Sequence, residues 1–303
     1  MLCIAHRGGA ALRPENTLEA FCHAIELGCD GAELDVQLTR DGEVVVVHDF
    51  ALSPDICRDT TGRWLERAYL PISELTLAEL QRFDVGRAKP GSNYAAAHPL
   101  VRWKDGARIP TLAQVVKVAR TAPRPFQLFA ELKTSFLDRS LSASPLPLAE
   151  ATVQVLREHE YVEHTTLVSF DWRGLLHARQ TADIECWFTT LPHNWLRGKA
   201  KASDAPAHSA LTRLSAAGRG VSAWVGGQNP LMYRGSVIKA IAAAGGQGWF
   251  ADYRDLTAQS VAEAGAMGLK VGAWTINDLT RIRAIRALGI DVVCTDRPDL
   301  LLA

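Results

Sequence analysis

GAELDVQLTRDGEVVVVHD, residues 31–49, is the most informative stretch of this 303-residue chain. Its first part, about Gly31–Thr39, is an apolar run typical of a buried strand. Asp41 and Gly42 form a hairpin turn signal, and Glu43–Val47 then returns as a second apolar run. The stretch therefore predicts a strand, a tight turn and an antiparallel return.

Short apolar runs alternate with helical patterns on both sides of this stretch, as they do in β/α units. The expected helices begin at capping residues such as Asn16, with Glu19 completing a capping box, and Thr111, and the first ends at Gly28. Eight runs of strand type begin at Leu2, Gly31, Phe126, Thr165, Ile184, Gly248, Lys270 and Asp291. Eight strands that are each followed by a helix predict an α/β fold, the TIM (β/α)8 barrel.

Two long segments interrupt this alternation. Residues 50 to about 108 carry several prolines and glycines and no β/α units, so we interpret them as an insertion after the second strand of a single barrel domain, 1–303. Residues 191–247 are also irregular, with one expected helix near Val237–Ala244. An open doubly wound sheet is the alternative fold, but His6-Arg7-Gly8-Gly9 does not match the phosphate loop G-x-G-x-x-G.

Composition excludes several classes of function. The chain has 33 basic and 33 acidic residues and no basic stripe, so we expect no nucleic-acid partner. No apolar run approaches the ~18 residues of a membrane span, and no signal-peptide pattern opens the sequence, so we expect a cytoplasmic protein. The six cysteines lack metal-site spacing and are interpreted as reduced thiols. Barrels often form homodimers, and no feature of the sequence decides whether this one does.

Polar residues gather where the expected strands end, which is where a barrel places its active site. Glu33 and Asp35 are two apart on one strand and share a face, as do Glu131 and Lys133 on another. Three close carboxylates cannot all stay ionised without a cation, and oxygen ligands suit Mg²⁺ or Ca²⁺. The competing interpretation is that these acids point outward and pair with basic side chains. Other polar or aromatic residues expected at strand ends are Asp171, Trp274, Thr275, Asn277, Thr295 and Asp296.

His6 and His48 each follow an apolar strand, a position where a single histidine is usually a buried core residue. Two of them beside one carboxylate cluster favour an acid/base pair for an in-line displacement. Arg7 supplies a planar fork for phosphate, and Lys133 supplies a point charge. Acids for a cation together with bases for an anion indicate phosphate-ester chemistry.

A series of short motifs gives these residues a family context. In chain order they are His6-Arg7-Gly8, Glu15-Asn16-Thr17, Glu33-Leu34-Asp35-Val36, Asp41-Gly42, His48-Asp49, Ile109-Pro110-Thr111-Leu112, Glu131-Leu132-Lys133, Trp274-Thr275-Ile276-Asn277 and Thr295-Asp296-Arg297-Pro298. Each is weak alone, but in this order and over nearly the whole chain they make the sequence resemble the glycerophosphodiester phosphodiesterases.

The resemblance implies a TIM barrel of lipid and glycerol metabolism that hydrolyses a small glycerophosphodiester to glycerol 3-phosphate and an alcohol. The residues that it implies are His6 and His48 as acid and base, Glu33, Asp35 and Glu131 as ligands of Mg²⁺ or Ca²⁺, and Arg7, Lys133 and Trp274 as substrate contacts. The approach from His48-Asp49 to Thr60-Thr61-Gly62 is longer than in many members, which leaves the alcohol open. Which histidine acts as the acid and which as the base also stays open. The nucleophile can be either water or the glycerol 2-hydroxyl.

Two other functions are compatible with the same barrel. A lysophospholipase D-like phosphodiesterase would need an apolar groove for an acyl chain, and no insertion loop is clearly apolar. A barrel that binds an anion without turnover, or that only scaffolds partners, would not need both His6 and His48.

Overall fold

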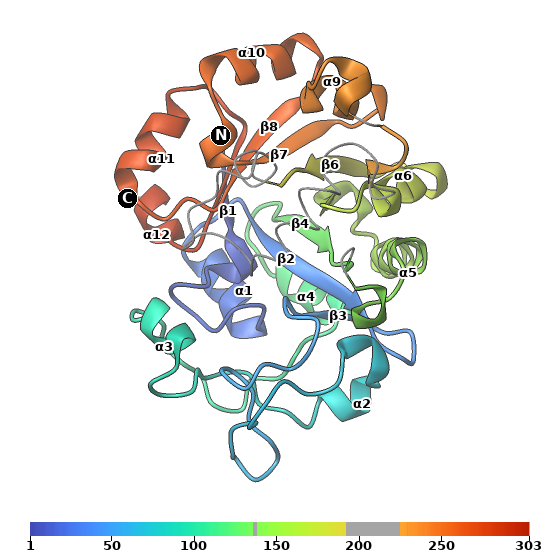
Figure 1. Ribbon diagram of the computed structural model, residues 1–303. Coiled ribbons are helices and arrows are strands. Elements are labelled where there is room, and N and C mark those ends of the chain that lie inside the picture. The colour runs from blue at the N-terminus through green and yellow to red at the C-terminus, as the bar shows by residue number, and fades with distance from the viewer. Residues whose placement is uncertain (136–137, 192–224, 229, 303) are drawn as a thin grey trace.

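The computed structural model describes residues 1–135, 138–191, 225–228 and 230–302, which form a closed parallel barrel surrounded by helices (Figure 1). The barrel strands are β1 (Leu2–Ala5), β2 (Gly31–Leu38), β4 (Gln127–Leu132), β5 (Thr165–Ser169), β6 (Glu185–Thr189), β7 (Gly248–Asp252), β8 (Lys270–Trp274) and β9 (Val292–Thr295). They pair in this order, and β9 pairs with β1 to close the ring. The TIM barrel predicted from the sequence is confirmed, and each strand begins within one residue of its predicted start.

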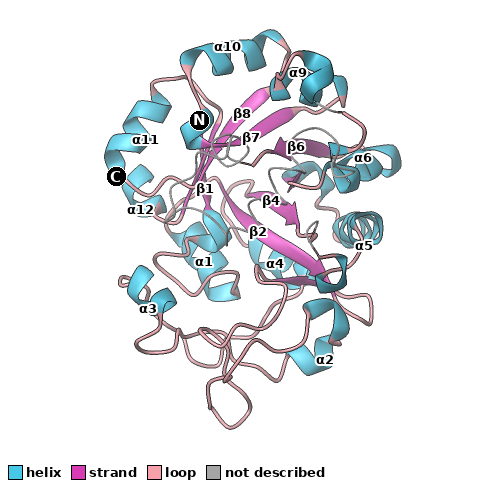
Figure 2. Cartoon of the chain, in the orientation of Figure 1, coloured by secondary structure: helices cyan, strands magenta, loops and turns pink. Residues whose placement is uncertain are grey.

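The helices lie outside the strands as an outer ring (Figure 2). Their bounds are α1 (Leu18–Glu26), α4 (Leu112–Ala119), α5 (Pro145–Glu158), α6 (Trp172–Thr181), α9 (Val237–Ala243), α10 (Ala258–Ala266), α11 (Leu279–Arg286) and α12 (Pro298–Leu302). In α4 the residues Leu112, Val115, Val116 and Ala119 are buried, which is the i, i+3, i+4, i+7 face of a helix packed on a sheet. None of the helices in the described ranges is long and apolar enough to cross a lipid bilayer.

The helix α1 begins differently from the sequence prediction. Its cap is Thr17, whose hydroxyl accepts a hydrogen bond from the backbone N–H of Ala20, so the predicted capping box of Asn16 and Glu19 is wrong. Asn16 lies in the left-handed region with φ 54°. Its side-chain amide turns into the barrel mouth and donates to Asp35 at 2.8 Å. The residue type that suits a cap is used here to hold a buried carboxylate.

Apolar side chains fill the barrel beneath its mouth. One cluster, inside the ring, consists of Ile4, Phe129, Val168, Trp187, Phe250, Val292 and Cys294. Phe129 packs edge-on against Trp187 with ring centroids 5.3 Å apart, and it also contacts Phe250 at 5.9 Å. A larger cluster fills the space between strands and helices. The barrel is therefore a packed core, and polar chemistry is confined to its ends.

The predicted turn and return appear as β3 (Val44–Val46), which pairs antiparallel with β2. From there to α4 the chain leaves the barrel and forms an insertion that carries α2 (Leu77–Leu80) and α3 (Asn93–Ala97) at one side of the ring (Figure 1). It has its own small core, made of Val45, Leu52, Cys57, Ile72, Leu75, Leu80 and Ile109. The short 3-10 helices of the described residues are η1 (His6–Gly8), η2 (Ile72–Glu74), η3 (Arg139–Leu141), η4 (Val162–His164), η7 (Pro230–Tyr233) and η8 (Tyr253–Asp255). Most of the irregular segment predicted for 191–247 lies outside the described residues, but its helix is present as α9.

Candidate active site

A pocket of about 200 Å³ opens where the parallel strands end. It is lined by His6, Arg7, Glu33, His48, Glu131, Lys133, Phe170, Thr189, Leu191, Phe250, Trp274 and Thr275. Seven of the eight site residues predicted from the sequence belong to this lining, and the eighth, Asp35, lies beneath them, only 1% exposed. One half of the lining is charged and comes from β1, β2, β4 and the segment after β3. The other half is mainly apolar and comes from the ends of β5 to β8.

Three carboxylates converge in the charged half. Glu33 and Asp35 project from β2, and the parallel register sets Glu131 of β4 opposite Asp35. One carboxylate oxygen from each residue lies within 4.8 Å of the other two. Burial raises the pKa of Glu33, and the neighbouring charge of Asp35 raises it further. Burial would also raise the pKa of Asp35, but the cations Arg7 and Lys133 hold it well below its ordinary value.

This cluster fits a divalent cation. Its donors are all carboxylate oxygens, which is the ligand chemistry of Mg²⁺ and Ca²⁺. The Lys133 ammonium lies 2.9 Å from Glu131 and 3.5 Å from Asp35, so it compensates two of the carboxylates. Burial, and next to it the charge of Asp35, raise the pKa of Glu33, and a cation bound between these carboxylates would favour its ionised form. Within the described ranges, this is the one cluster of three or more acids, histidines or cysteines with spacing suited to a metal ion.

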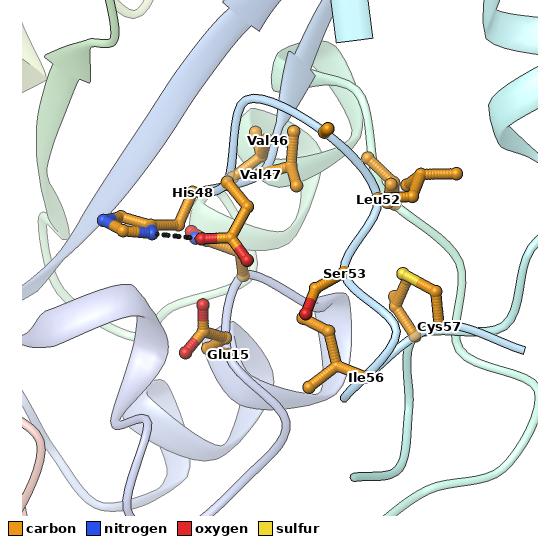
Figure 3. Close-up of a pocket in the computed structure, with 13 residues that line it drawn as sticks. Glu15, Val46, Val47, His48, Leu52, Ser53, Ile56 and Cys57 are labelled. Carbon is orange, nitrogen blue, oxygen red and sulfur yellow. Dashed lines mark hydrogen bonds and ion pairs between the residues drawn. The ribbon is translucent and has the colours of Figure 1, made fainter. Parts of the chain in front are cut away.

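Each of the two histidines is held by a carboxylate. Nδ1 of His6 lies 2.6 Å from Oδ1 of Asp296. Nδ1 of His48 lies 2.9 Å from Oδ1 of Asp49, a contact drawn as the dashed line at His48 in Figure 3. The Nε2 atom of His6 lies 3.7 Å from Oε2 of Glu33, on the side of the acidic cluster. Because a carboxylate fixes Nδ1 as the protonated nitrogen, Nε2 is the atom left for exchange of a proton with a ligand.

Asp296 is itself positioned by a second contact. The side-chain amide of Asn277 donates to its Oδ2 at 2.6 Å, and the backbone N–H of Asp296 donates back to Oδ1 of Asn277 at 2.9 Å. Burial disfavours the charged form of His6, but the Asp296 carboxylate overcomes it and raises the pKa of the imidazole. In turn, and against its own burial, the pKa of Asp296 falls to about 2 beside His6. Both shifts favour the imidazolium–carboxylate form of the pair.

Arg7 is fixed by an unusual backbone conformation. It lies at φ 50°, in the left-handed region, and its backbone N–H donates to Oε2 of Glu33 at 3.1 Å. Gly8 follows at φ 80°, where a Cβ would come within 2.6 Å of the Cβ of Ala20, so only glycine allows this close turn. The guanidinium donates from Nη1 to Glu15 at 3.0 Å, and its Nε lies 3.3 Å from Asp35. Arg7 is thereby held at the edge of the acidic cluster.

The apolar half is built from rings rather than charges. Phe170 and Trp274 meet edge-to-face, with centroids 5.5 Å apart and planes at 82°. The indole N–H of Trp274 donates to the backbone carbonyl of Phe250 at 3.1 Å, which fixes the ring. This wall offers contact to carbon atoms of a ligand, across the pocket from the charged groups.

Some functional positions follow from the sequence and others do not. Asp171 follows β5, as expected, but it is buried, caps α6 and pairs with Arg173 at 2.6 Å, and it does not line the pocket. Asp49, Asp296 and Glu15, which hold His48, His6 and Arg7, were given no role. Their place in the matching motifs is the signal that could have found them.

Comparisons with known proteins show which proteins this chain resembles. The profile of the glycerophosphoryl diester phosphodiesterase family matches residues 6–300. The chain is 33% identical over 181 residues to the glycerophosphodiester phosphodiesterase of Caldanaerobacter subterraneus subsp. tengcongensis, an alignment that covers 60% of this chain and 63% of that relative, less than two thirds of its length. It is 27% identical over 307 residues to YhdW of Bacillus subtilis, a candidate glycerophosphodiester phosphodiesterase, with 100% of this chain and 97% of the relative covered.

Solved structures share the fold. A candidate glycerophosphoryl diester phosphodiesterase from Silicibacter pomeroyi DSS-3 superposes with a TM-score of 0.79 at 28% identity, covering 99% of this chain and 91% of that chain. A phosphodiesterase from Oleispira antarctica, solved in complex with the product sn-glycerol-3-phosphate, gives a TM-score of 0.68 at 22% identity, with 100% and 97% covered.

Proposed function

This chain belongs to the glycerophosphoryl diester phosphodiesterase family, a family of phosphoric diester hydrolases, and we propose that it hydrolyses glycerophosphodiesters to glycerol 3-phosphate and an alcohol. The observation that carries the proposal is the pocket in which His6 and His48 share one face with the acidic cluster and two cations. The name of the Caldanaerobacter relative and the product bound to the Oleispira phosphodiesterase support the same substrate class.

We propose that Glu33, Asp35 and Glu131 hold a divalent cation, Mg²⁺ or Ca²⁺. When bound, such a cation supplies Lewis-acid stabilisation of negative charge on the phosphate. The charges of the chain suit this arrangement, because Lys133 and Arg7 already compensate part of the cluster and remain close to the place where an anion would lie.

The two histidines divide the proton transfers in this proposal. One accepts a proton at Nε2 from the nucleophile, which is water or the glycerol 2-hydroxyl, and the other donates a proton to the oxygen of the departing alcohol. Asp296 and Asp49 keep the imidazoles oriented throughout. Arg7 and Lys133 contact the phosphate oxygens, and Trp274 packs against the carbon atoms of the substrate.

The size of the pocket favours a small diester. A volume of about 200 Å³ suits a glycerol phosphate with a short headgroup better than a lipid with an acyl chain. The comparisons favour neither a lysophospholipase D-like activity nor a barrel that binds without turnover. We therefore propose glycerophosphocholine and glycerophosphoethanolamine as the first substrates to assay.

The test is release of glycerol 3-phosphate from these two diesters, measured by a dehydrogenase-coupled assay. We expect EDTA to abolish release and added Mg²⁺ or Ca²⁺ to restore it. Release of choline from lysophosphatidylcholine, measured in parallel, separates the lipid alternative, because the other product of that cleavage is lysophosphatidic acid and not glycerol 3-phosphate. A folded protein that releases no glycerol 3-phosphate with either metal would overturn the proposed function.

A further inference from the structure

One residue of the insertion reaches the charged half of the site. The hydroxyl of Tyr94, in α3, donates to Oε2 of Glu15 at 2.6 Å. The ring of Tyr94 stacks on His98 with centroids 4.1 Å apart, and Nδ1 of His98 lies 2.8 Å from the carbonyl oxygen of Tyr94. These contacts fix the tyrosine, so its hydroxyl meets Glu15 in one defined orientation.

Glu15 connects the insertion to Arg7. Its second oxygen, Oε1, accepts from Nη1 of Arg7 at 3.0 Å, so each oxygen of this carboxylate has a different partner. The Nε of Arg7 lies beside Asp35. None of the hydrogen bonds among the described residues uses Nη2 of Arg7. Figure 3 shows Glu15 and His48 in the lining of one pocket, together with the insertion residues Ser53 and Ile56.

A carboxylate beside a guanidinium favours two parallel hydrogen bonds, one from each oxygen. That fork would need both oxygens of Glu15 and would use a second nitrogen of Arg7. Instead, Oε2 of Glu15 accepts from the Tyr94 hydroxyl, and the hydrogen bond from Arg7 to Glu15 is a single one, at Oε1.

We propose that Tyr94 is a positioning residue: by holding one oxygen of Glu15 it keeps the second terminal nitrogen of Arg7 available to the substrate phosphate. The inference rests on the proposed function, because it assumes that the anion bound beside Arg7 is a phosphate. It gives the insertion a part in phosphate binding, although the insertion supplies none of the acidic cluster.

The test replaces Tyr94 with Phe, which keeps the ring and removes the hydroxyl. Affinity for inorganic phosphate and for glycerol 3-phosphate is measured by calorimetry at a fixed Mg²⁺ concentration, so turnover is not required. We expect about 10-fold weaker binding of both, and a similar rise in KM with kcat within about twofold, because the lost contact is made equally in ground and transition states. Tyr69→Phe, in the same insertion but packed on Phe83, is the matched control and should change neither value.

A double-mutant cycle separates positioning from general packing. In a Glu15→Gln background, Tyr94→Phe should have no further effect, because the carboxylate through which the tyrosine acts is gone. Melting temperatures of all variants show whether each one folds. Unchanged phosphate affinity in Tyr94→Phe, or an equal loss in the Glu15→Gln background, would overturn the inference. If the wild-type chain binds phosphate but cleaves no diester, the proposed function fails. The effect of Tyr94→Phe on phosphate affinity can still be measured in that case.

Discussion

The charged and apolar halves of the barrel mouth are held in place by different forces. In the charged half, side chains are fixed by ion pairs and hydrogen bonds, such as Lys133 between Glu131 and Asp35. In the apolar half, they are fixed by ring contacts and one indole hydrogen bond, as for Phe170 and Trp274. The charged half holds groups with shifted pKa values, whereas the apolar half presents only an apolar surface to a ligand.

This difference suggests a division of labour. Buried charges that are only partly balanced in the protein can be balanced by a ligand, so the charged half is where binding and bond cleavage meet. An apolar wall contributes in equal measure to the bound substrate and to the transition state. Substitutions of the proton-transfer groups in the charged half should therefore lower kcat, and those in the apolar half should raise KM.

The largest effect is expected from removal of either histidine. His6→Ala and His48→Ala should each lower kcat on glycerophosphocholine by roughly 10²–10⁴-fold, because each removes a proton-transfer group. Steady-state kinetics measure this. His177→Ala, which removes a histidine paired with Glu150 outside the mouth, is the control and should keep wild-type kcat. If His6→Ala and His48→Ala changed only KM and left kcat unchanged, the proposed difference in role between the two halves would be contradicted.

The next effect concerns the carboxylate behind His6. Asp296→Asn should lower kcat by about 10–100-fold, since the imidazole loses the partner that orients it and stabilises its positive charge. Because Asp296 raises the pKa of His6, the variant should move the limb of the pH–rate profile that reports His6 to lower pH. A pH profile of kcat/KM checks this, and a limb that stays in place or moves upward would show that Asp296 does not act through His6.

Lys133→Met gives opposite effects on the two kinds of ligand. Without the ammonium, the carboxylates of Glu131 and Asp35 are less compensated, so Mn²⁺ as a probe cation should bind several-fold tighter. Phosphate should bind about 10-fold more weakly, because a cation beside it is gone. Calorimetric titration measures the affinity for Mn²⁺ and the affinity for phosphate separately. If both affinities rose or both fell, the electrostatic account of the charged half would be contradicted.

The smallest effect is expected in the apolar half. Trp274→Leu should raise KM for glycerophosphocholine about three- to tenfold and leave kcat within about twofold, as expected for loss of uniform binding. Trp64→Leu, in the insertion, where the ring packs near Arg58, is the comparison variant. If Trp274→Leu lowered kcat as far as His48→Ala does, the two halves would not differ in role.

The frame of the molecule could be predicted from local patterns, whereas the partners of the site residues could not. Apolar runs bounded by caps and glycines predict β1 to β9 closely, because strand burial leaves a direct mark on residue type. The pair Glu33 and Asp35 could also be predicted, because side chains two positions apart on a strand point toward the same face. The contact of His6 with Asp296 joins residues 290 positions apart, and no local spacing encodes it.

The wrong capping prediction has the same origin. Asn16 has the residue type of a helix cap, yet tertiary contact with Asp35 draws its side chain inward and leaves the cap to Thr17. Asp171 follows β5 as predicted, and only the structure shows that it pairs with Arg173 at the start of α6 and does not line the pocket. In both cases a polar residue had two uses, and only the folded arrangement decides between them.

The most direct test of the central claim is a ³¹P NMR time course of glycerophosphocholine with the wild-type chain and His48→Ala, both with excess Mg²⁺. The account predicts that the wild-type chain converts the diester resonance into that of glycerol 3-phosphate, while the variant leaves the diester intact. Appearance of phosphocholine instead of glycerol 3-phosphate, or equal rates for the two proteins, would contradict it.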